Sequence, residues 1–319
     1  MARLLVTGGV GFIGYHVARA LLERGDDVVV ADDFSDRPYP VREKLRNEAD
    51  LVADFPRARV VRACVTDRAA MTPLVGEADA VLHLAGLAGV RPSFGDPVRY
   101  ARVNVEGTAV VQELARERGI ERFLFASSSS IYGNATPLPA REDAPAVVPE
   151  SPYAASKRAA ELIASSICRN APAMRCAALR FFTVYGPRQR PEMAITQFMR
   201  AAIAGRPITL FGEGTMRRDF THVEDIVRGV LAALDAKAPA GFRAYNLGSG
   251  APIDLRSLVE AIGGAAGTKL QVVTAPVPLG DVDATFADIS RARTELGWSP
   301  RMTLRAGLAT VLDWVREHP

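Results

Sequence analysis

Short runs of apolar residues alternate with longer amphipathic segments through the first half of the chain. An apolar run after Arg3 leads into a glycine-rich turn, and helical spacing follows from 15 to 24, where Gly25 ends it. Further apolar runs predict buried strands at 28–31, 60–63, 80–85, 123–126 and 177–181. Long helical patterns separate the last three runs. This alternation predicts an α/β fold with a doubly wound parallel sheet.

The character of the chain changes at about residue 187, where Pro, Gly and Arg become frequent and regular spacing is lost. Ligands of doubly wound sheets bind beyond the carboxyl ends of the strands. We therefore expect a cofactor-binding domain over 1–180 and a smaller C-terminal substrate-binding lobe over 181–319. A helix is expected at 219–234 and a strand at 244–248, and segments near 219–250 are candidates to return to the first domain.

Glycines 8, 9, 11 and 14 lie between the first predicted strand and the first predicted helix. This spacing allows a tight turn and a close approach of phosphate groups to the helix N-terminus. Asp32 and Asp33 follow the second strand, where a carboxylate accepts hydrogen bonds from an adenosine ribose and repels a 2′-phosphate. The alternative is a merely tight turn, which the strand–helix–strand–Asp context disfavours. The pattern indicates a Rossmann domain that binds NAD rather than NADP.

Tyr153 and Lys157 form a second candidate site. Ser151 and Pro152 suit the start of a helix, and helical spacing continues to Ile167. Residues four apart share a helix face, and a cation beside a phenol lowers the pKa of that phenol. Tyr153 is therefore a candidate general base. The alternative is an ordinary interfacial tyrosine beside a solvated lysine.

Two further polar groups lie near predicted strand ends. Four serines, 127–130, follow the strand at 123–126, and arginines occur in 183–190 and 217–220. Serine hydroxyls can contact a reacting sugar, and arginine suits phosphate or carboxylate. Taken alone, the serine run is equally consistent with a solvated loop. Two arginines in a surface loop are more often simply solvated. The glycine turn and the tyrosine–lysine pair favour roles in binding an anionic ligand.

Composition excludes several other classes of protein. The chain has 319 residues, 48% hydrophobic and 24% charged, with a net charge of +3, as in ordinary globular proteins. No basic run with interleaved aromatic residues suggests a nucleic-acid surface, and no apolar stretch has membrane length. The glycine turn begins too early for a signal peptide. Three cysteines and four histidines without metal-ligand spacing predict free thiols, no metal and a cytoplasmic protein.

These motifs together resemble the extended short-chain dehydrogenase/reductase family across essentially the whole chain. The matching segments are 8–14, Asp32, 83–86, Asn104, the serine run, Tyr153 with Lys157, 218–220, 281–288 and 296–300. Within this family the chain is most similar to nucleotide-sugar 4-epimerases, specifically those acting on UDP-glucuronate.

Comparison with other branches of that family narrows the resemblance. The 4,6-dehydratases carry Asp-Glu where this chain has Ser129 and Ser130, and UDP-glucuronate decarboxylases carry a Glu that this chain lacks. UDP-galactose 4-epimerases usually have Asn in place of Thr183, and Thr183 with 186–194 is similar to the glucuronate type. Two positions depart from the family pattern. Cys64 replaces an Asp expected beside the adenine, and Pro278 replaces an expected phosphate-binding Arg.

The resemblance implies roles for individual residues. The implied catalytic residues are Ser128, Tyr153 and Lys157. The implied cofactor-binding residues are Gly8, Gly11, Phe12, Ile13, Gly14, Asp32, Asp33, Phe34, Cys64, Val65, Leu84, Ala85, Gly86 and Asn104, with Tyr153 and Lys157. The implied UDP-sugar-binding residues are Arg91, Ser129, Ser130, Thr183, Arg190, Arg218 and Asp281. The resemblance also implies a homodimer, formed through helices near 98–117 and 152–169.

The implied reaction is 4-epimerisation through a 4-keto sugar. Tyr153 takes the proton of the 4-hydroxyl, bridged by Ser128, while hydride passes to NAD and returns to the opposite face. Ser129, Ser130 and Thr183 would hold the glucuronate carboxylate near the carbonyl plane and so oppose decarboxylation. The alternatives are a UDP-glucose/UDP-galactose 4-epimerase and a cofactor-binding sensor that uses the fold without catalysis.

Overall fold

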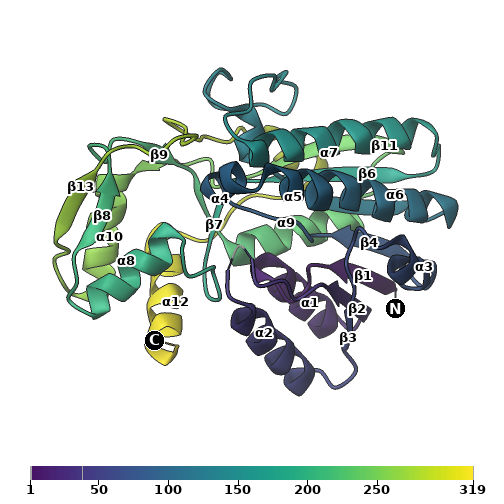
Figure 1. Cartoon of the computed structure of the whole chain (residues 1–319), viewed down its shortest axis with the longest axis horizontal. Helices are drawn as coiled ribbons and strands as arrows, with labels where there is room; N and C mark the ends of the chain where they lie inside the picture. Colours follow the sequence, from purple (N-terminus) through teal and green to yellow (C-terminus); the bar gives the residue numbers. More distant parts are fainter. Residues whose placement is uncertain (1, 38, 319) are drawn as a thin grey trace.

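The computed structural model describes residues 2–37 and 39–318, which form a larger and a smaller part (Figure 1). The larger part is built on a parallel sheet of seven strands in the order β11-β6-β5-β4-β1-β2-β3. These strands are β1 (Arg3–Thr7), β2 (Asp27–Asp32), β3 (Arg59–Arg62), β4 (Ala80–His83), β5 (Arg122–Ser128), β6 (Arg175–Phe181) and β11 (Gly241–Leu247). The predicted doubly wound Rossmann sheet is confirmed.

Helices cover both faces of this sheet (Figure 1). One face packs against α1 (Phe12–Arg24), α2 (Val41–Asp54), α9 (Val223–Asp235) and α11 (Ser290–Leu296). The other face packs against α3 (Arg68–Gly76), α6 (Gly107–Glu117) and α7 (Pro152–Arg169). The central strands carry consecutive apolar residues because both of their faces are covered. Leu4, Leu5 and Val6 of β1, for example, are all fully buried.

Three strand predictions need correction at their ends. β3 is an edge strand, so the run at 60–63 is only partly buried rather than a buried strand. The run at 80–85 leaves the sheet after His83. β5 continues past Ala126, because Ser127 and Ser128 still pair with β6, whose partners there are Arg180 and Phe181. The first two serines of the run are therefore strand residues, and Ser129 begins the 3-10 turn η2 (Ser129–Tyr132).

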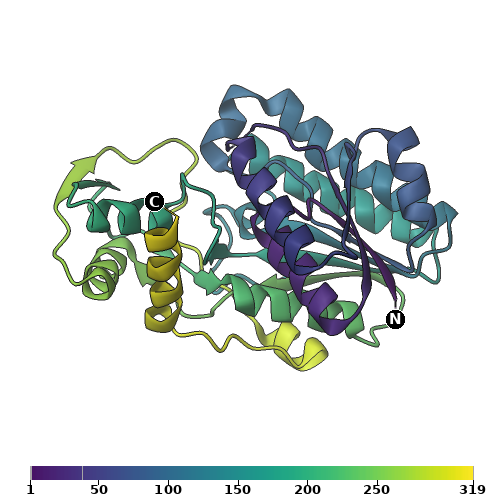
Figure 2. The ribbon, with the colours of Figure 1, turned by 90° about the horizontal axis from the view of Figure 1, so that it is seen from below.

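The smaller part has a core of its own (Figure 2). Its elements are β7 (Thr183–Tyr185), α8 (Ala194–Ile203), β8 (Ile208–Phe211), β9 (Arg217–Arg218), β10 (Phe220–His222), β12 (Ile253–Asp254), α10 (Leu255–Ala266), β13 (Val272–Ala275) and α12 (Leu304–Glu317). Figure 2 shows α12, in yellow, on the side of this lobe nearest the sheet. Two small sheets lie apart from the main sheet. In one of them β8 pairs with β13, and in the other β7 pairs with β10.

The segment 219–250 is divided between the two parts. The helix expected from 219 begins only at Val223, because 220–222 form β10 and the His222 side chain caps the helix. This helix, α9, packs under the main sheet, and β11 extends that sheet beside β6. A domain boundary near residue 180 stays a prediction.

The loops that follow β1, β2, β4 and β5 emerge at one edge of the main sheet. The strand order reverses between β1 and β4, which leaves a crevice where doubly wound sheets bind ligands. After β4, the chain forms α4 (Val90–Gly95), α5 (Pro97–Ala101) and the π-helical turn η1 (Arg102–Glu106) before α6. Within residues 2–37 and 39–318, no helix is both long and apolar enough to cross a bilayer.

Candidate functional site

A cavity of about 1030 Å³ lies between this sheet edge and the smaller lobe. The glycine turn after β1 and the acidic end of β2 line one part, and α7 with the serine run line another. Residues of 207–211, 218–220 and 280–285 close it from the smaller lobe. One cavity therefore joins the predicted cofactor site to the predicted substrate site.

The glycine turn is shaped to receive a phosphate group. Gly8 has φ of +69°, and a Cβ there would lie 2.6 Å from the Ala85 amide nitrogen. A Cβ on Gly14 would lie only 2.0 Å from the Gly8 carbonyl oxygen. Gly11 precedes α1 without a side-chain cap, so the first amides of the helix stay available to an anion. This turn fits the pyrophosphate of a dinucleotide.

Asp32 ends β2 beside a lysine that the sequence interpretation did not assign to the site. Lys44 of α2 is buried, and its Nζ donates to Asp32 Oδ1 at 2.8 Å and to Asp33 Oδ1 at 3.3 Å. Burial alone would lower the pKa of Lys44, but the two carboxylates outweigh it and raise that pKa. The Phe34 amide also donates to Asp32 Oδ1, at 3.0 Å. These described contacts are to Oδ1 alone, and binding of a ribose by the other Asp32 oxygen stays a prediction.

Helix α7 carries both Tyr153 and Lys157, as the helical spacing predicted. The Ser151 side chain caps the helix, with Pro152 in its first turn. Lys157 lies one turn beyond Tyr153, and its Nζ donates to the Ala126 carbonyl oxygen at 2.9 Å. A Cβ on Gly86 would lie 2.9 Å from this Nζ, so a larger residue in the loop after β4 would displace the end of the Lys157 side chain.

The electrostatics of the pair differ from the sequence-based expectation. Burial raises the pKa of Tyr153, and the interactions that oppose the rise come from the Ser128 hydroxyl and Arg190. Burial also lowers the pKa of Lys157 to about 8, partly offset by the charge of Glu161. The expected lowering of the Tyr153 pKa by Lys157 is therefore wrong for the protein alone.

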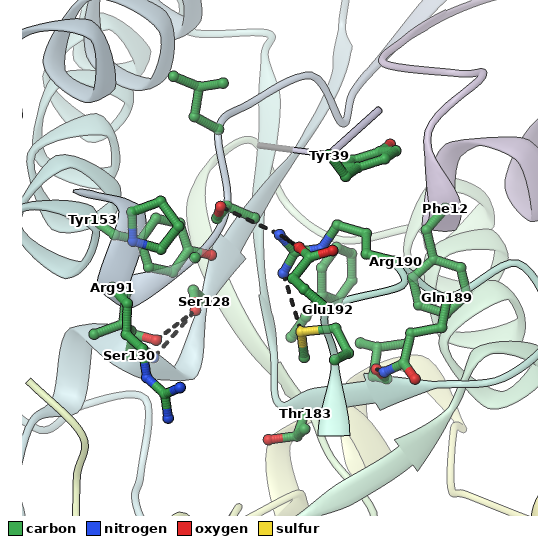
Figure 3. A pocket seen from close by; sticks show the side chains of 18 of the residues that line it. Phe12, Tyr39, Arg91, Ser128, Ser130, Tyr153, Thr183, Gln189, Arg190 and Glu192 are labelled. Carbon is green, nitrogen blue, oxygen red and sulfur yellow. Dashed lines mark hydrogen bonds and ion pairs between the residues drawn. The ribbon is translucent and has the colours of Figure 1, made fainter. Parts of the chain in front are cut away.

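The Ser128 and Ser130 side chains lie close to Tyr153, on one side of it (Figure 3). The Ser128 oxygen accepts from the Ser130 amide, and its hydroxyl donates to Ser130 Oγ, both at 3.2 Å. Ser129 is buried beside them, and Thr183 begins β7 across the cavity. The hydroxyl groups expected to contact the sugar thus line the same cavity.

Three predicted arginines also line the cavity, and contacts with other protein groups hold each of them in place. Arg91 pairs with Asp281 at 3.1 Å and lies over the Phe211 ring at 4.3 Å. Arg190 contacts Glu192 at 2.8 Å and donates to the Ala88 carbonyl oxygen.

Arg218 makes hydrogen bonds to the carbonyl oxygens of Arg217 and Asp283. Burial lowers the pKa of its guanidinium, and the nearby charge of Arg91 contributes in the same direction. Two cations held close together in a partly buried site favour an anionic ligand such as a diphosphate.

Three residues expected to contact the cofactor do not line the cavity. Phe34 turns away under the Arg62 guanidinium, 4.1 Å from its ring centroid. The Cys64 thiol makes a hydrogen bond with Thr66 at 3.2 Å. Asn104 makes hydrogen bonds to both backbone groups of Leu87 and to Ser156, and so fixes the loop after β4 against α7. The Asn104 side chain is therefore engaged by protein groups, and its contact with the cofactor stays a prediction.

Several residues that line the cavity were missed. They include Ser35, Arg37, Tyr39, Lys44, Gln189, Glu192 and Phe211. Gln189 and Glu192 lie next to the predicted Arg190 in the sequence, and this proximity could have identified them as cavity residues. Lys44 and Tyr39 lie in α2 and the loop before it, and no motif marks them. Among the described residues, no cluster of His, Cys, Asp and Glu could hold a metal ion.

A parallel sheet, a glycine turn with an acidic residue after β2, and a tyrosine–lysine pair in one cavity define a nicotinamide-dinucleotide enzyme. Comparison with known proteins agrees. Residues 4–248 match the model of the NAD dependent epimerase/dehydratase family. The chain belongs to this family, and the predictions of an epimerase-type enzyme and of NAD as cofactor are confirmed.

Individual relatives resemble the chain over its whole length. It is 36% identical to a UDP-glucuronate 4-epimerase of Thermodesulfobacterium geofontis, covering 100% of this chain and 97% of that one. The structure of a Bacillus cereus UDP-glucuronic acid 4-epimerase with UDP-glucuronic acid and NAD superposes with a TM-score of 0.93 at 32% identity, covering 99% of both chains. A Thermotoga maritima UDP-glucose 4-epimerase with UDP-glucose gives 0.87 at 29% identity, again over 99% of both.

We expect the purified protein to release mainly NAD, and little NADP, when it is denatured. Asp32 would repel a 2′-phosphate, although Lys44 partly balances its charge. Asp32→Asn should therefore shift the preference toward NADP by at least about tenfold, or ~1.4 kcal/mol, because the Lys44 cation would then face the phosphate. Asp32→Asn with Lys44→Met should lose this gain. Chromatography of the released nucleotide measures the outcome, and mainly NADP from the unaltered protein would refute the role of Asp32.

Proposed function

We propose that this protein is an NAD-dependent 4-epimerase that converts UDP-glucuronate to UDP-galacturonate. The observation that carries the proposal is the cavity itself. Tyr153 and Ser128 share it with the neutral hydroxyls of Ser129, Ser130 and Thr183. The relatives that are UDP-glucuronate 4-epimerases support this choice of substrate.

The proposed proton transfer begins at the sugar 4-hydroxyl. Bound NAD accepts hydride from carbon 4 and later returns it. Tyr153 takes the hydroxyl proton, and Ser128 stabilises the oxygen that loses it. Since burial alone raises the Tyr153 pKa, the base needs help to ionise. The Ser128 and Arg190 interactions oppose that rise, and the positive charge of oxidised NAD would add to them.

Lys157 would hold the cofactor rather than ionise Tyr153 directly. Its buried ammonium has one protein acceptor, the Ala126 carbonyl oxygen, among the described contacts. An ammonium carries three donors. The remaining donors can bind ribose hydroxyls, and the cofactor would then supply partners that the protein does not.

We expect NAD affinity to depend on pH through Lys157. Its pKa in the protein is about 8, below the ordinary 10.5, so the ammonium is charged below pH 8 without any ligand. Ribose oxygens that accept its hydrogen bonds would raise this pKa, so binding above pH 8 must take up a proton. The Kd should be level below about pH 8 and then weaken, approaching tenfold per pH unit. Calorimetry from pH 7 to 9.5 measures this slope, and an equal slope in Lys157→Met would contradict it.

The hydroxyl groups near Tyr153 also suit a carboxylate at carbon 5 of the sugar. The keto acid formed from glucuronate loses carbon dioxide when the breaking bond stands perpendicular to the carbonyl plane. Ser129, Ser130 and Thr183 can donate to the carboxylate and hold that bond near the plane. Neutral donors fit this task, since an acid there would assist decarboxylation or elimination.

Thr183→Val tests the carboxylate hypothesis, because it keeps the shape and removes one hydroxyl. Oxidation at carbon 4 should survive, while the less restrained keto acid loses carbon dioxide more often. A loss of about 1–2 kcal/mol of restraint would raise UDP-4-keto-pentose and NADH roughly 5- to 30-fold relative to epimerisation. Product ratio and NADH absorbance measure the change. If Thr183 only packs beneath the sugar, the variant will slow UDP-glucose and UDP-glucuronate equally and the ratio will not change.

A UDP-glucose/UDP-galactose 4-epimerase is the second candidate, favoured by the resemblance to the Thermotoga maritima enzyme. The two candidates are separated by assaying the purified protein with each sugar and following the anomeric signals by NMR. The proposal expects turnover of UDP-glucuronate to exceed that of UDP-glucose. Retained NAD with no turnover of any nucleotide sugar would favour a sensor without catalysis.

We also propose that the protein is a cytoplasmic homodimer. Val98 of α5 and Leu162 of α7 are large apolar side chains with exposed fractions of 78% and 57%. They lie on helices that pack against each other, and apolar side chains gathered on adjacent helices suit a subunit contact. Cys168 and Cys176 are both free thiols within 3.7 Å of Gln112 Nε2, which suits a reducing compartment. Light scattering tests the dimer.

A further inference from the structure

Arg188 occupies an unusual position in the loop that carries Arg190. This loop, 186–193, joins β7 to α8 and brings Gln189, Arg190, Glu192 and Met193 to the cavity. Arg188 does not line the cavity, yet its backbone has φ of +65°. Residues with a Cβ rarely adopt this left-handed conformation, and it persists only where surrounding contacts enforce it.

The Arg188 side chain supplies those contacts. Its guanidinium lies between two aromatic rings, 4.0 Å from the Tyr15 ring of α1 and 4.6 Å from the Trp314 ring of α12. Nη1 donates to Asn47 Oδ1 at 2.7 Å, and Nη2 donates to Asp50 Oδ2 at 2.5 Å, both on α2. The Arg188 side chain therefore links the loop 186–193 to α1 and α2 of the larger part and to α12 of the smaller lobe.

Asn47 extends this connection into the cofactor site. Its Nδ2 donates to the Val10 carbonyl oxygen at 2.9 Å, and Val10 lies inside the glycine turn. A second link runs parallel, because His16 Nε2 lies 3.0 Å from the Pro187 carbonyl oxygen. A carbonyl oxygen only accepts, so neutral His16 must donate through Nε2. Two short chains of hydrogen bonds therefore join the loop beside Arg190 to the turn and helix that face the cofactor.

We propose that Arg188 is a positioning residue that couples the two nucleotide sites, so that a nucleotide diphosphate held by Arg190 slows the release of NAD. The proposal rests on the proposed function, which assigns Arg190 to the diphosphate of the substrate. A diphosphate orders 186–193, and Arg188 and Asn47 then hold the glycine turn closed around the pyrophosphate of NAD. To the extent that slower release reflects tighter equilibrium binding of NAD, linkage makes the gain in affinity reciprocal, so that NAD tightens diphosphate binding by the same factor.

The test uses the purified enzyme with its bound NAD and UDP alone as the probe. NAD release is followed after dilution, with and without saturating UDP. Coupling between sites typically amounts to about 5–150-fold, so UDP should slow NAD release by at least about fivefold in the unaltered protein. In Arg188→Met this ratio should fall close to one. Asn47→Ala should do the same, and combining the two changes should lower the ratio no further.

Arg19→Met is the matched control. Arg19 pairs with Asp54 and so also bridges α1 and α2. It donates to the Tyr15 hydroxyl, but none of its described contacts is to a residue of 186–193. This variant should keep the UDP effect. If Arg188 only stabilises the fold, Arg188→Met will speed NAD release equally with and without UDP. The ratio of the two release rates will then stay as in the unaltered protein, and this result would overturn the proposal.

A parallel turnover assay separates this proposal from the proposed function. Protein that epimerises UDP-glucuronate, but whose NAD release is indifferent to UDP, would contradict only the coupling. Protein whose NAD release is slowed by UDP through Arg188, but which epimerises neither UDP-sugar, would contradict only the proposed function.

Discussion

Tyr153→Phe is expected to lower turnover of UDP-glucuronate by about 10²–10⁴-fold, the usual contribution of a general acid–base group. The variant removes the hydroxyl whose oxygen is proposed to accept the proton and leaves the half-buried ring in place. Fold and NAD content should therefore persist, which circular dichroism and release of the cofactor can check. Initial rates of UDP-galacturonate formation give the loss.

Two variants calibrate this result. Tyr100→Phe makes the same chemical change in a ring 6.1 Å away, whose hydroxyl donates to the Ala88 carbonyl oxygen in its one described hydrogen bond. It should cost less than about tenfold, as expected for one lost hydrogen bond of about 1 kcal/mol. Ser128→Ala should be intermediate, because it deletes one hydrogen bond worth about 1–3 kcal/mol if buried. Turnover in Tyr153→Phe equal to that in Tyr100→Phe would refute Tyr153 as the base.

Arg180→Met is expected to destabilise the fold by about 3–5 kcal/mol, because it removes the buried cation that binds both Glu161 oxygens and leaves that carboxylate with the more exposed Arg158 as its ion pair. Arg180 Nε and Nη2 donate to the two Glu161 oxygens at 2.9 and 2.8 Å. The side chains are exposed by only 3% and 0%. Glu161 also accepts from the Ser127 hydroxyl at 2.6 Å, directly beside Ser128. Chemical denaturation measures the loss of unfolding free energy.

The exposed pair of Arg68 and Glu117 provides the control. It has a comparably short contact of 2.5 Å, but its side chains are exposed by 49% and 41%. Arg68→Met should therefore cost no more than about 1 kcal/mol. Replacing both Arg180 and Glu161 by apolar residues should recover part of the loss, because no buried charge is then left alone. If Arg68→Met and Arg180→Met lower the unfolding free energy equally, burial does not determine how much an ion pair contributes to stability.

Local spacing predicted those parts of the site that lie within one element and its flanking turn. The glycine turn was predictable because Gly8 and Gly14 lie against backbone atoms, where a Cβ does not fit. Glycines are therefore required at these positions, and their spacing is visible in the sequence. Tyr153 and Lys157 were predictable because a helix places them one turn apart. The roles assigned to the individual residues stay predictions until they are measured.

Long-range contacts account for what the sequence did not predict. Asn104 matched a family motif, but its side chain bonds to Leu87 and Ser156, which lie far from it in the sequence. Lys44 reaches Asp32 only because α2 packs against β2, and no motif marks that approach. The pKa of Tyr153 was misjudged for the same reason. Spacing shows a neighbouring charge but does not show how deeply the sheet and the smaller lobe bury the phenol.

The central claim is that this protein epimerises UDP-glucuronate by removing and returning the same hydride. The most direct test is to supply the purified protein, without added NAD, with UDP-glucuronate that carries deuterium at carbon 4. The account predicts UDP-galacturonate that retains deuterium at carbon 4, visible by NMR and mass spectrometry. UDP-galacturonate that has exchanged this deuterium for solvent hydrogen, or the absence of UDP-galacturonate, would contradict the account.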